Sequence, residues 1–320
     1  MKIAYLIAAH QDARQLKRLI SALYVPNHTD FFIHVDSKVD MSPFEHEVSD
    51  FTQAGDNRII FSQNRHNVMW GTFSQCKYQL SLIKECLEVN EEYDRVIFLS
   101  GLDYPVWSNE RLFKFWTNNP NLEYIAGINI SSPMMEQRQR RKVDRYYFFP
   151  PSISNHKVYK FFRRVSFHII TPLIRLIKKK NPMVMIQGKE CPIYYGSSWW
   201  GITYKCLRGI WPILNDKDYQ KFFRTGFTPD EQFIQTAVYN SRFSENCIGG
   251  DDKTRPVGLT RLTPMHLIDY KDSIKIFTTD DYEEVIRSDK MFIRKVVSGK
   301  SDVLIEKLEI NRCSNKSSGI

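Results

Sequence analysis

The amino-terminal part of the chain alternates between apolar runs and an amphipathic stretch, and this pattern limits the fold more than any other feature. Lys2 to Ala9 is a continuous apolar run, and Phe31 to Val35 is another. Between them, Gln11 to Tyr24 carries apolar residues at helical spacing. A strand, a helix and a second strand in so short a span predict a βαβ unit, which implies a parallel sheet covered by helices. We therefore expect an α/β fold.

The length of 320 residues allows one large α/β domain or two small ones. We expect a single domain over residues 1–310, with a basic, aromatic-rich insertion at 137–183. Residues 311–320 have a composition that favours a disordered tail.

Net charge and cysteine content limit the binding partners and the cellular compartment that we expect for the chain. The net charge of +9 favours an anionic partner, which could be a phosphorylated substrate, a nucleic acid or an acidic membrane. The six cysteines are scattered without a Cys-x-x-Cys pair, which argues against a zinc site and suits a reducing compartment. The first residues resemble a buried strand more than a signal peptide, and no apolar run reaches the roughly 18 residues of a membrane span. We expect a cytoplasmic protein.

Polar residues follow the predicted strands where ligands bind in open parallel sheets. His10 follows the first strand and Asp36 the second, so both are placed to meet a nucleotide, although Asp36 could equally cap a turn. No Gly-x-Gly-x-x-Gly sequence follows the first strand and no Walker sequence occurs, which makes classical dinucleotide or P-loop binding unlikely.

A further aspartate, Asp103, follows the apolar run that ends near Ser100. An Asp-x-Asp pair at such a position would hold a divalent metal on a diphosphate, but Gly101 stands in the first place. The literal Asp-x-Asp at 216–218 lies in a charged segment and is interpreted as a solvated turn. We therefore predict no metal site.

Thr228-Pro229-Asp230-Glu231 places two carboxylates directly behind a proline and ahead of an apolar run. Proline suits the first turn of a helix, where the helix dipole also favours acidic residues. The local pattern alone therefore favours a helix start. The alternative is that one carboxylate points into a cleft as a general base.

Residues 137–180 are unusually basic and are interleaved with aromatic and aliphatic residues. They could form an amphipathic helix on an anionic membrane. They could equally pack their apolar side on the protein and leave the lysines in water. In either case we expect Pro172 to interrupt any long helix. Nucleic-acid binding is a third interpretation, which no recognisable motif supports.

The segment from Gly196 to Trp200 combines a glycine, small hydroxyl residues and paired tryptophans. Aromatic faces stack on sugar rings, so this segment could be an acceptor platform. Buried tryptophan that needs no ligand is the alternative.

Taken together in chain order, short segments across the sequence resemble the core-2/I-branching N-acetylglucosaminyltransferases and their relatives, the peptide-O-xylosyltransferases. The resemblance extends from residue 3 to about residue 296. The segments are the opening strand to Ala9-His10, His34 to Lys38, Val68 to Gly71 with Ser74, Leu99 to Pro105, Gly196 to Trp200, Pro229 to Glu231, and Phe292 to Lys295.

The resemblance implies a GT-A-type, Rossmann-like, mostly parallel sheet flanked by helices, with a UDP-sugar donor, inversion at the anomeric carbon and no metal. It implies Glu231 as the catalytic base and Lys295 as a contact to the donor diphosphate. The family's second diphosphate-binding arginine falls on His266 here, so Arg261, Arg255 or Arg294 could replace it. The expected donor-binding residues are His10, Asp36, Asp103, His266, Arg261, Arg294 and Lys295. The expected acceptor-binding residues are Trp70, Ser198, Trp199, Trp200 and Asp230, with Asp230 mainly structural or capping.

We therefore expect an inverting, metal-independent enzyme without a cofactor that transfers a sugar from a UDP-sugar to a hydroxyl of a glycan or glycolipid. N-acetylglucosamine is the first choice of sugar, and xylose or another pentose is the alternative. An alternative of another class is a non-catalytic protein that binds an anionic membrane or nucleic acid through residues 137–180. The resemblance is to a bacterial-type, cytoplasmic relative, for which peripheral attachment at the inner face of the cell membrane is open and no nucleic-acid partner is expected.

Overall fold

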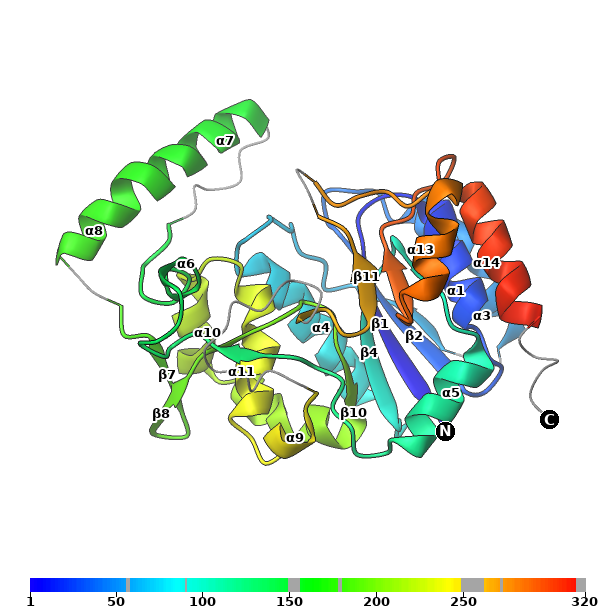
Figure 1. Ribbon diagram of the computed structural model, residues 1–320, viewed down its shortest axis with the longest axis horizontal. Helices are drawn as coiled ribbons and strands as arrows, with labels where there is room; N and C mark the ends of the chain where they lie inside the picture. Colours follow the sequence, from blue (N-terminus) through cyan, green and yellow to red (C-terminus); the bar gives the residue numbers. More distant parts are fainter. Residues whose placement is uncertain are drawn as a thin grey trace.

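A mostly parallel five-stranded sheet forms the centre of the molecule (Figure 1). The computed structural model describes residues 1–55, 58–89, 91–148, 156–177, 180–248, 262–270 and 273–314. The strand order is β10-β4-β1-β2-β3, and β10 alone pairs antiparallel, at one edge. The strands are β1 (Ile3–Ala9), β2 (Thr29–Val35), β3 (Ile59–Phe61), β4 (Arg95–Ser100) and β10 (Gly201–Thr203).

The predicted βαβ unit is confirmed. Strands β1 and β2 pair in parallel from Ile3 opposite Thr29 onward, and helix α1 (Ala13–Leu23) connects them. The carboxylate of Asp12 caps α1 by accepting a hydrogen bond from the backbone N–H of Gln15. Every residue of β2 is buried, as expected for a strand covered on both faces.

Helices cover both faces of the sheet, and alternate strand residues supply the two cores. Ala4 and Leu6 of β1 face one core, whereas Tyr5 and Ile7 face the other. The predicted α/β class, with a mostly parallel sheet flanked by helices, is therefore confirmed. The helices of the first core are α4 (Ser74–Glu88), α9 (Tyr204–Leu214), α10 (Lys217–Arg224) and α11 (Phe233–Tyr239). Those of the second are α1, α5 (Asn109–Asn118), α13 (Tyr282–Arg287) and α14 (Asp302–Ser314).

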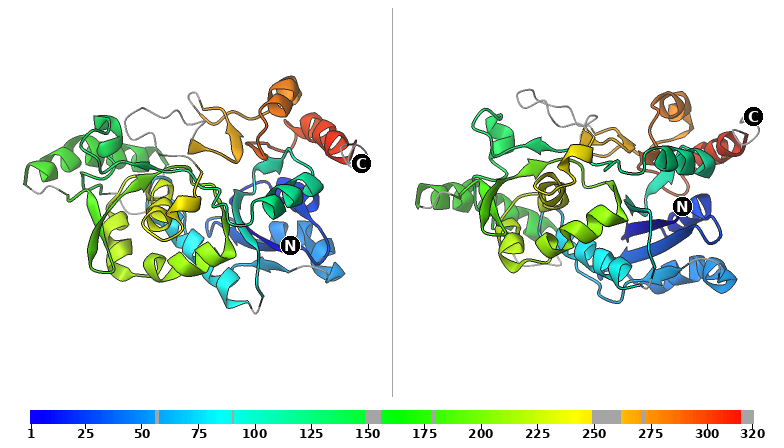
Figure 2. Two further views of the ribbon diagram at one scale, coloured as in Figure 1. Left: turned by 60° about the horizontal axis from the view of Figure 1, so that its bottom comes forward. Right: turned by 90° about the horizontal axis from the view of Figure 1, so that it is seen from below.

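A second, three-stranded sheet stands beyond the carboxyl end of β4 (Figures 1 and 2). Its order is β11-β12-β5, with β11 (His266–Ile268) parallel and β5 (Asp103–Pro105) antiparallel to β12 (Phe292–Arg294). This sheet brings the carboxy-terminal part of the chain beside the strand ends where a ligand is expected. The remaining short elements are α2 (Ser42–Glu47), α3 (Ser49–Ala54), β6 (Ile128–Asn129), α6 (Gln137–Arg140), β7 (Met183–Ile186), β8 (Lys189–Pro192) and β9 (Tyr194–Tyr195).

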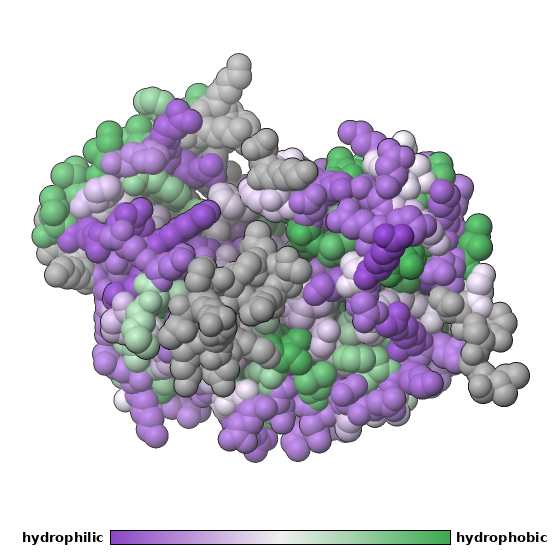
Figure 3. Space-filling view, in the orientation of Figure 1, coloured by the Kyte–Doolittle hydropathy of each residue, from purple (hydrophilic) through white to green (hydrophobic). Residues whose placement is uncertain are grey.

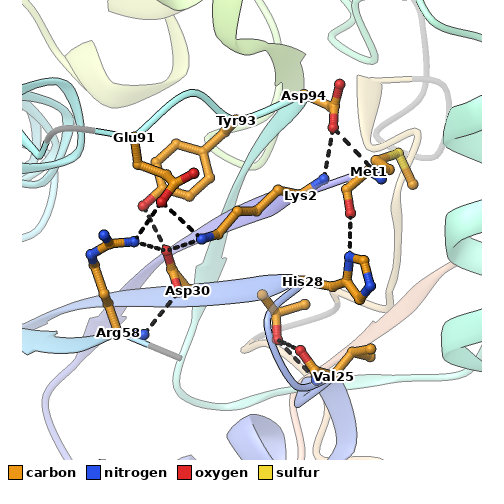
Figure 4. A network of polar contacts seen from close by, with 10 residues as sticks. Met1, Lys2, Val25, His28, Asp30, Arg58, Glu91, Tyr93 and Asp94 are labelled. Atoms are coloured by element: carbon orange, nitrogen blue, oxygen red, sulfur yellow. Dashed lines mark hydrogen bonds and ion pairs between the residues drawn. The ribbon is translucent and has the colours of Figure 1, made fainter. Parts of the chain in front are cut away.

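The opposite end of the central sheet is held by a network of charges (Figure 4). The buried Asp30 carboxylate accepts hydrogen bonds from the Tyr93 hydroxyl at 2.8 Å and the Arg58 guanidinium at 3.1 Å. The Lys2 ammonium lies 3.4 Å from the same oxygen and 3.1 Å from Glu91. These contacts tie the amino ends of β1 and β2 to the segment before β4, so the network has a structural role away from the strand ends where ligands bind.

The basic insertion contains a helical rod, which stands at the upper left of Figure 1. The rod consists of α7 (His156–Val165), a π-helical turn (Ser166–Ile170) and α8 (Thr171–Ile177). Pro172 does not interrupt it, so that expectation was wrong. The backbone N–H of Thr171 bonds to the carbonyl of Ser166, which is the wider spacing of a π-turn. This widening directly before Pro172 relieves the clash that proline causes within an α-helix.

Other local expectations also need correction. Pro229–Glu231 is a single 3₁₀ turn, and α11 begins only at Phe233, because Gln232 has a non-helical φ of −131°. Asp216 is the N-cap of α10, where it accepts a hydrogen bond from the Tyr219 N–H, so the Asp-x-Asp sequence opens a helix.

The disordered tail was predicted to begin at residue 311, which is too early. Helix α14 continues to Ser314, and Arg312 within it is buried, with its guanidinium donating to the carbonyls of Trp107 and Ala22. Residues 315–320 lie outside the described residues. In the described part of the chain, no helix is both long and apolar enough to cross a membrane.

Candidate active site

A cavity of about 760 Å³ opens at the carboxyl ends of β1, β2 and β4. Strand-end residues form its floor, and the second sheet and the basic insertion form parts of its walls. Its size and position are those of a ligand site in an open α/β sheet. Lining residues include His10, Asp36, Trp70, Arg138, Arg141, Lys142, Tyr195, Ser198, Trp199, Asp230, Glu231 and Arg294.

The two residues that follow β1 and β2 both line this cavity. Asp36 is buried, and its carboxylate accepts a hydrogen bond from the Lys38 N–H at 3.0 Å while its second oxygen lies 3.3 Å from the Lys38 ammonium. Asp36 therefore does stabilise a turn, and it does so on the cavity wall. Desolvation lowers the pKa of His10, and the positive charges of Arg294 and Lys295 lower it further. His10 is thus neutral at pH 7.

Asp103, His266 and Arg294 form a polar cluster on the second sheet. The Asp103 carboxylate is fully buried and accepts a hydrogen bond from the Arg294 guanidinium at 2.9 Å, while its other oxygen lies 3.1 Å from His266 Nε2. Burial alone would raise the pKa of Asp103, but the charges of His266 and Arg294 outweigh it and hold the pKa below its usual value. The cluster fixes the direction of the Arg294 side chain.

Only Arg294 of this cluster reaches the cavity. Its guanidinium lies over the ring of Trp199, 4.5 Å from the ring centroid, and both residues line the wall. Asp103 and His266 are almost completely buried behind that wall. The expectation that they contact the donor directly is therefore corrected: they hold Arg294 in place.

Lys295 is partly buried beside the cavity and does not form its wall. Within the described ranges it forms no ion pair, although its charge acts on His10. Arg255 and Arg261, the other candidates for the second cation, lie outside the described residues.

The proposed base, Glu231, lies in an ion pair with a residue of the basic insertion. Its carboxylate lies 3.1 Å from the Lys142 ammonium, which also lies 3.6 Å from the centroid of the Tyr195 ring. Desolvation lowers the pKa of Lys142, and the charge of Glu231 opposes this effect. Burial raises the pKa of Tyr195, and the charge of Glu231 and a hydrogen bond to it raise it further. Glu231 thus has a cation and a neutral phenol beside it.

The turn that carries Glu231 is strained and tightly held. Thr228 has a φ of 47°, a left-handed conformation that costs a β-branched residue on the order of 1 kcal/mol or more. The Glu231 carbonyl accepts a hydrogen bond from the Gly196 N–H at 2.8 Å. A Cβ atom at Gly196 would lie 2.0 Å from the Ala126 carbonyl oxygen, so only glycine fits there. The backbone of this turn is therefore fixed from both sides.

Asp230 differs sharply from its neighbour. Its Oδ2 accepts hydrogen bonds from the Ser198 hydroxyl at 2.7 Å and the Gln75 amide at 3.1 Å, while its buried Oδ1 has no hydrogen-bond partner in the described structure. Burial, followed by the charge of Glu231, raises the pKa of Asp230 to about 7. Asp230 caps no helix, which corrects that expectation.

The expected acceptor platform is only partly formed. Trp70 is 59% exposed at the rim, where it packs edge-on against Phe227. Trp199 lines the cavity and stacks on Phe98 at 5.3 Å. Trp200 is completely buried, stacks on Phe98 at 5.5 Å and belongs to the core, so it does not line the cavity as an acceptor contact would require.

Several cavity residues were missed by sequence reasoning. Lys142 pairs with Glu231 across 89 positions, and Arg138 and Arg141 precede it along the same wall. Tyr195 completes the surroundings of the base. The only sequence signal was the density of arginine and lysine after residue 137, which was interpreted as a surface feature.

A parallel sheet whose carboxyl ends open into a large cavity, with a carboxylate, a fixed arginine and aromatic rings on its walls, defines an α/β enzyme of the Rossmann-like class. Residues 3–256 match the family described as Core-2/I-Branching enzyme. The chain belongs to the core-2/I-branching enzyme family, and the resemblance found in the sequence is confirmed.

Curated relatives carry related names. The chain is 35% identical over 255 residues to human xylosyltransferase 2, covering 78% of this chain and 26% of that protein. It is 30% identical over 140 residues to the Drosophila melanogaster xylosyltransferase oxt, covering 43% of this chain and 16% of that protein. The chain thus spans about a quarter or less of the curated relatives' length.

The structure of mouse xyloside xylosyltransferase 1 aligns over 91% of this chain and 97% of that one, with a TM-score of 0.36 and 11% identity. The family description and the names of the curated relatives are those of glycosyltransferases.

Proposed function

We propose that this chain is an inverting glycosyltransferase that moves a sugar from a UDP-sugar to a hydroxyl of a glycan or glycolipid acceptor. The observation that carries the proposal is that Glu231, Arg294 and Trp199 line one cavity at the strand ends. A base, a cation and an aromatic face are what such a transfer requires. The family to which the chain belongs supports the same reaction class.

Glu231 is the group suited to act as general base. It takes the proton from the acceptor hydroxyl while that oxygen attacks the anomeric carbon from the face opposite UDP. Asp230, with its raised pKa, holds a proton more readily than an ordinary aspartate and so places less negative charge beside Glu231. The fixed turn before Gln232 aims the carboxylate at the cavity.

Negative charge grows on the departing diphosphate and has to be neutralised by fixed cations. Arg294 is preorganised for this by its bond to Asp103, and Lys295 is the adjacent charge. The described residues contain no group of three or more His, Cys, Asp or Glu side chains arranged to hold a metal ion. A reaction that uses these side-chain cations in place of a metal is part of the proposal and rests on the resemblance in the sequence.

The donor sugar is proposed on two different grounds. The resemblance in the sequence favours N-acetylglucosamine. The curated relatives are named xylosyltransferases, which favours UDP-xylose as the second candidate. Acceptor contacts are proposed for Trp70, Trp199 and Ser198, which all line the cavity. We further propose a cytoplasmic location for the chain.

A panel of UDP-sugars tests the proposal. Release of UDP and thermal stabilisation by each nucleotide sugar are measured for the native protein and for Glu231→Gln. The proposal requires transfer or hydrolysis with at least one UDP-sugar, and loss of that turnover in the variant while UDP still stabilises the fold. A protein that shows no affinity for UDP but binds nucleic acid or anionic lipid in a salt-sensitive manner would support the non-catalytic alternative.

A further inference from the structure

The rod formed by α7, the π-turn and α8 presents an apolar stripe to solvent. Leu176 is 84% exposed and Phe161 is 63% exposed, although both are large apolar side chains. The stripe residues recur at helical spacing, so they share one side of the rod. They are Val158, Phe161, Phe162, Ile169, Leu173 and Leu176. The hydrophobic surface at the upper left of Figure 3 coincides with the rod in Figure 1.

The polar side of the rod, in contrast, faces the protein. The hydroxyl of Ser166 donates a hydrogen bond to the carbonyl of Phe148, and Thr171 is buried. The Arg175 guanidinium lies 3.2 Å from the Asp144 carboxylate. The alternative expectation that the insertion packs its apolar side on the protein is therefore not met by the stripe residues of the rod. The nearby Lys180 is also buried, and it donates to the Phe222 carbonyl.

The charge of this segment selects the kind of partner that covers the stripe. Residues 156–180 contain eight Lys and Arg residues and no Asp or Glu. A second copy of the chain would bring two such segments together on molecules that each carry a net charge of +9, which repulsion disfavours. An anionic lipid surface offers an apolar layer for the stripe and negative charge for a segment of this basic composition.

The rod also has the dimensions of an interfacial helix. From His156 to Ile177 it extends roughly 33 Å at 1.5 Å per residue, and it is held to the protein along one side only. We propose that the apolar stripe of the rod docks the protein on an anionic lipid bilayer, with the rod lying in the plane of the membrane surface.

Side-chain contacts connect the rod to the cavity. Phe167 packs against Tyr147 at 5.2 Å and Phe227 at 5.3 Å, and the Arg163 guanidinium lies 5.4 Å from the ring of Trp70. Tyr147, Phe227 and Trp70 line the cavity rim. Docking therefore brings that rim close to the lipid surface. If the proposed function holds, an acceptor carried in the membrane reaches Glu231 from this side.

Vesicle sedimentation tests the docking with the purified full chain. The lipids are phosphatidylcholine alone and phosphatidylcholine mixed with phosphatidylserine. The native protein is expected to sediment with the mixed vesicles. The double variant Leu173→Asp/Leu176→Asp should bind them about tenfold more weakly or worse, because two exposed anchors become charged. The matched control is Val303→Asp/Ile310→Asp on α14, where both residues are also exposed and apolar, and its binding should equal that of the native protein.

The outcomes that overturn the docking proposal are distinct. Native protein that does not bind the mixed vesicles, or a rod variant that binds as well as the native protein, rejects it. Light scattering that shows a dimer lost in the rod variant assigns the stripe to a second copy instead. If Leu173→Asp/Leu176→Asp lowers the melting temperature, Leu176→Ser replaces it, since that side chain is the most exposed of the stripe. Thermal stabilisation by UDP in the absence of vesicles reports on the proposed function separately.

Discussion

The Lys142 ammonium lies 3.1 Å from the Glu231 carboxylate, although the two residues are separated by 89 positions in the chain. Lys142 comes from the basic insertion and Glu231 from the Pro-Asp-Glu turn, so the insertion completes the surroundings of the proposed base. The ion pair is partly shielded from water, with side-chain exposures of 16% and 29%. It should therefore affect the chemistry of Glu231 more than a surface ion pair would.

The first prediction concerns Lys142→Met. Removing the ammonium takes away the positive charge 3.1 Å from the Glu231 carboxylate, so the acidic limb of the pH profile of kcat/KM should move to higher pH. UDP affinity should change little. The measurement is the pH dependence of UDP release with the best donor of the UDP-sugar panel.

Lys142→Arg is the matched control for this prediction, because it retains the positive charge. It should keep the acidic limb close to that of the native protein. If Lys142→Met and Lys142→Arg shift the profile equally, the effect comes from altered packing against Tyr195 and the electrostatic explanation fails.

The second prediction concerns Glu231→Gln, which keeps the shape of the side chain but cannot accept a proton. Turnover should fall by about 10²–10⁴-fold, the usual contribution of a general base, with UDP binding retained. Glu88→Gln on the exposed side of α4 is the control and should be fully active. Turnover by Glu231→Gln at the native rate would remove Glu231 from the mechanism.

The third prediction concerns stability and pH. The pKa of Asp230 is raised to about 7 in the folded protein from an ordinary value near 3.8, so the native state binds this proton more tightly than the unfolded state does. The group therefore destabilises the fold progressively as pH rises from about 4 to about 7. Asp230→Asn cannot ionise and should lose less stability over that range.

Chemical denaturation at a series of pH values measures this effect. The difference in free energy of unfolding, variant minus native, should increase with pH at up to about 1.4 kcal/mol per pH unit and level off above pH 7. A constant offset from the changed hydrogen bonds to Ser198 and Gln75 does not affect this slope. A difference independent of pH would show that Asp230 is ionised throughout.

The fold was predictable from the sequence because the βαβ unit uses strong local signals. The apolar run to Ala9 and the helical spacing up to Leu23 are buried for the reasons that their patterns indicate. The helix boundaries were less predictable where hydrogen bonds from side chains to the backbone decide them. Gln232 interrupts the Pro229 turn because its side chain donates to the carbonyls of Phe227 and Thr228.

Residues of the site were predictable from the sequence only where they belong to a recognisable motif. Glu231 and Arg294 belong to segments of the family resemblance, and both line the cavity. Lys142 has no local signal, since its role depends on how the insertion folds back on the cavity. Trp199 and Trp200 are adjacent in sequence just before β10, yet one lines the cavity and the other enters the core, a difference that only the tertiary packing decides.

The fourth prediction concerns metals. If Arg294 and Lys295 neutralise the diphosphate, turnover should persist in an excess of chelator, and added Mg²⁺ or Mn²⁺ should not be required. UDP release is measured before and after exhaustive treatment with EDTA. Complete loss of turnover that Mn²⁺ restores would contradict the metal-free part of the proposal and leave the family assignment untouched.

The fifth prediction separates positioning from direct contact in the cluster on the second sheet. Arg294→Met should weaken UDP binding about tenfold or more, because a charge-assisted contact to the diphosphate is lost. Asp103→Asn should weaken UDP binding as well, but indirectly, through release of Arg294. It should also destabilise the protein by about 3–5 kcal/mol, the usual cost of removing one partner of a buried ion pair. Arg287→Met, an exposed arginine on α13, is the control for lost charge.

Nucleotide titration and chemical denaturation of the same variants distinguish the two roles. If Asp103→Asn binds UDP as the native protein does, Arg294 holds its position without Asp103, and the cluster is structural only.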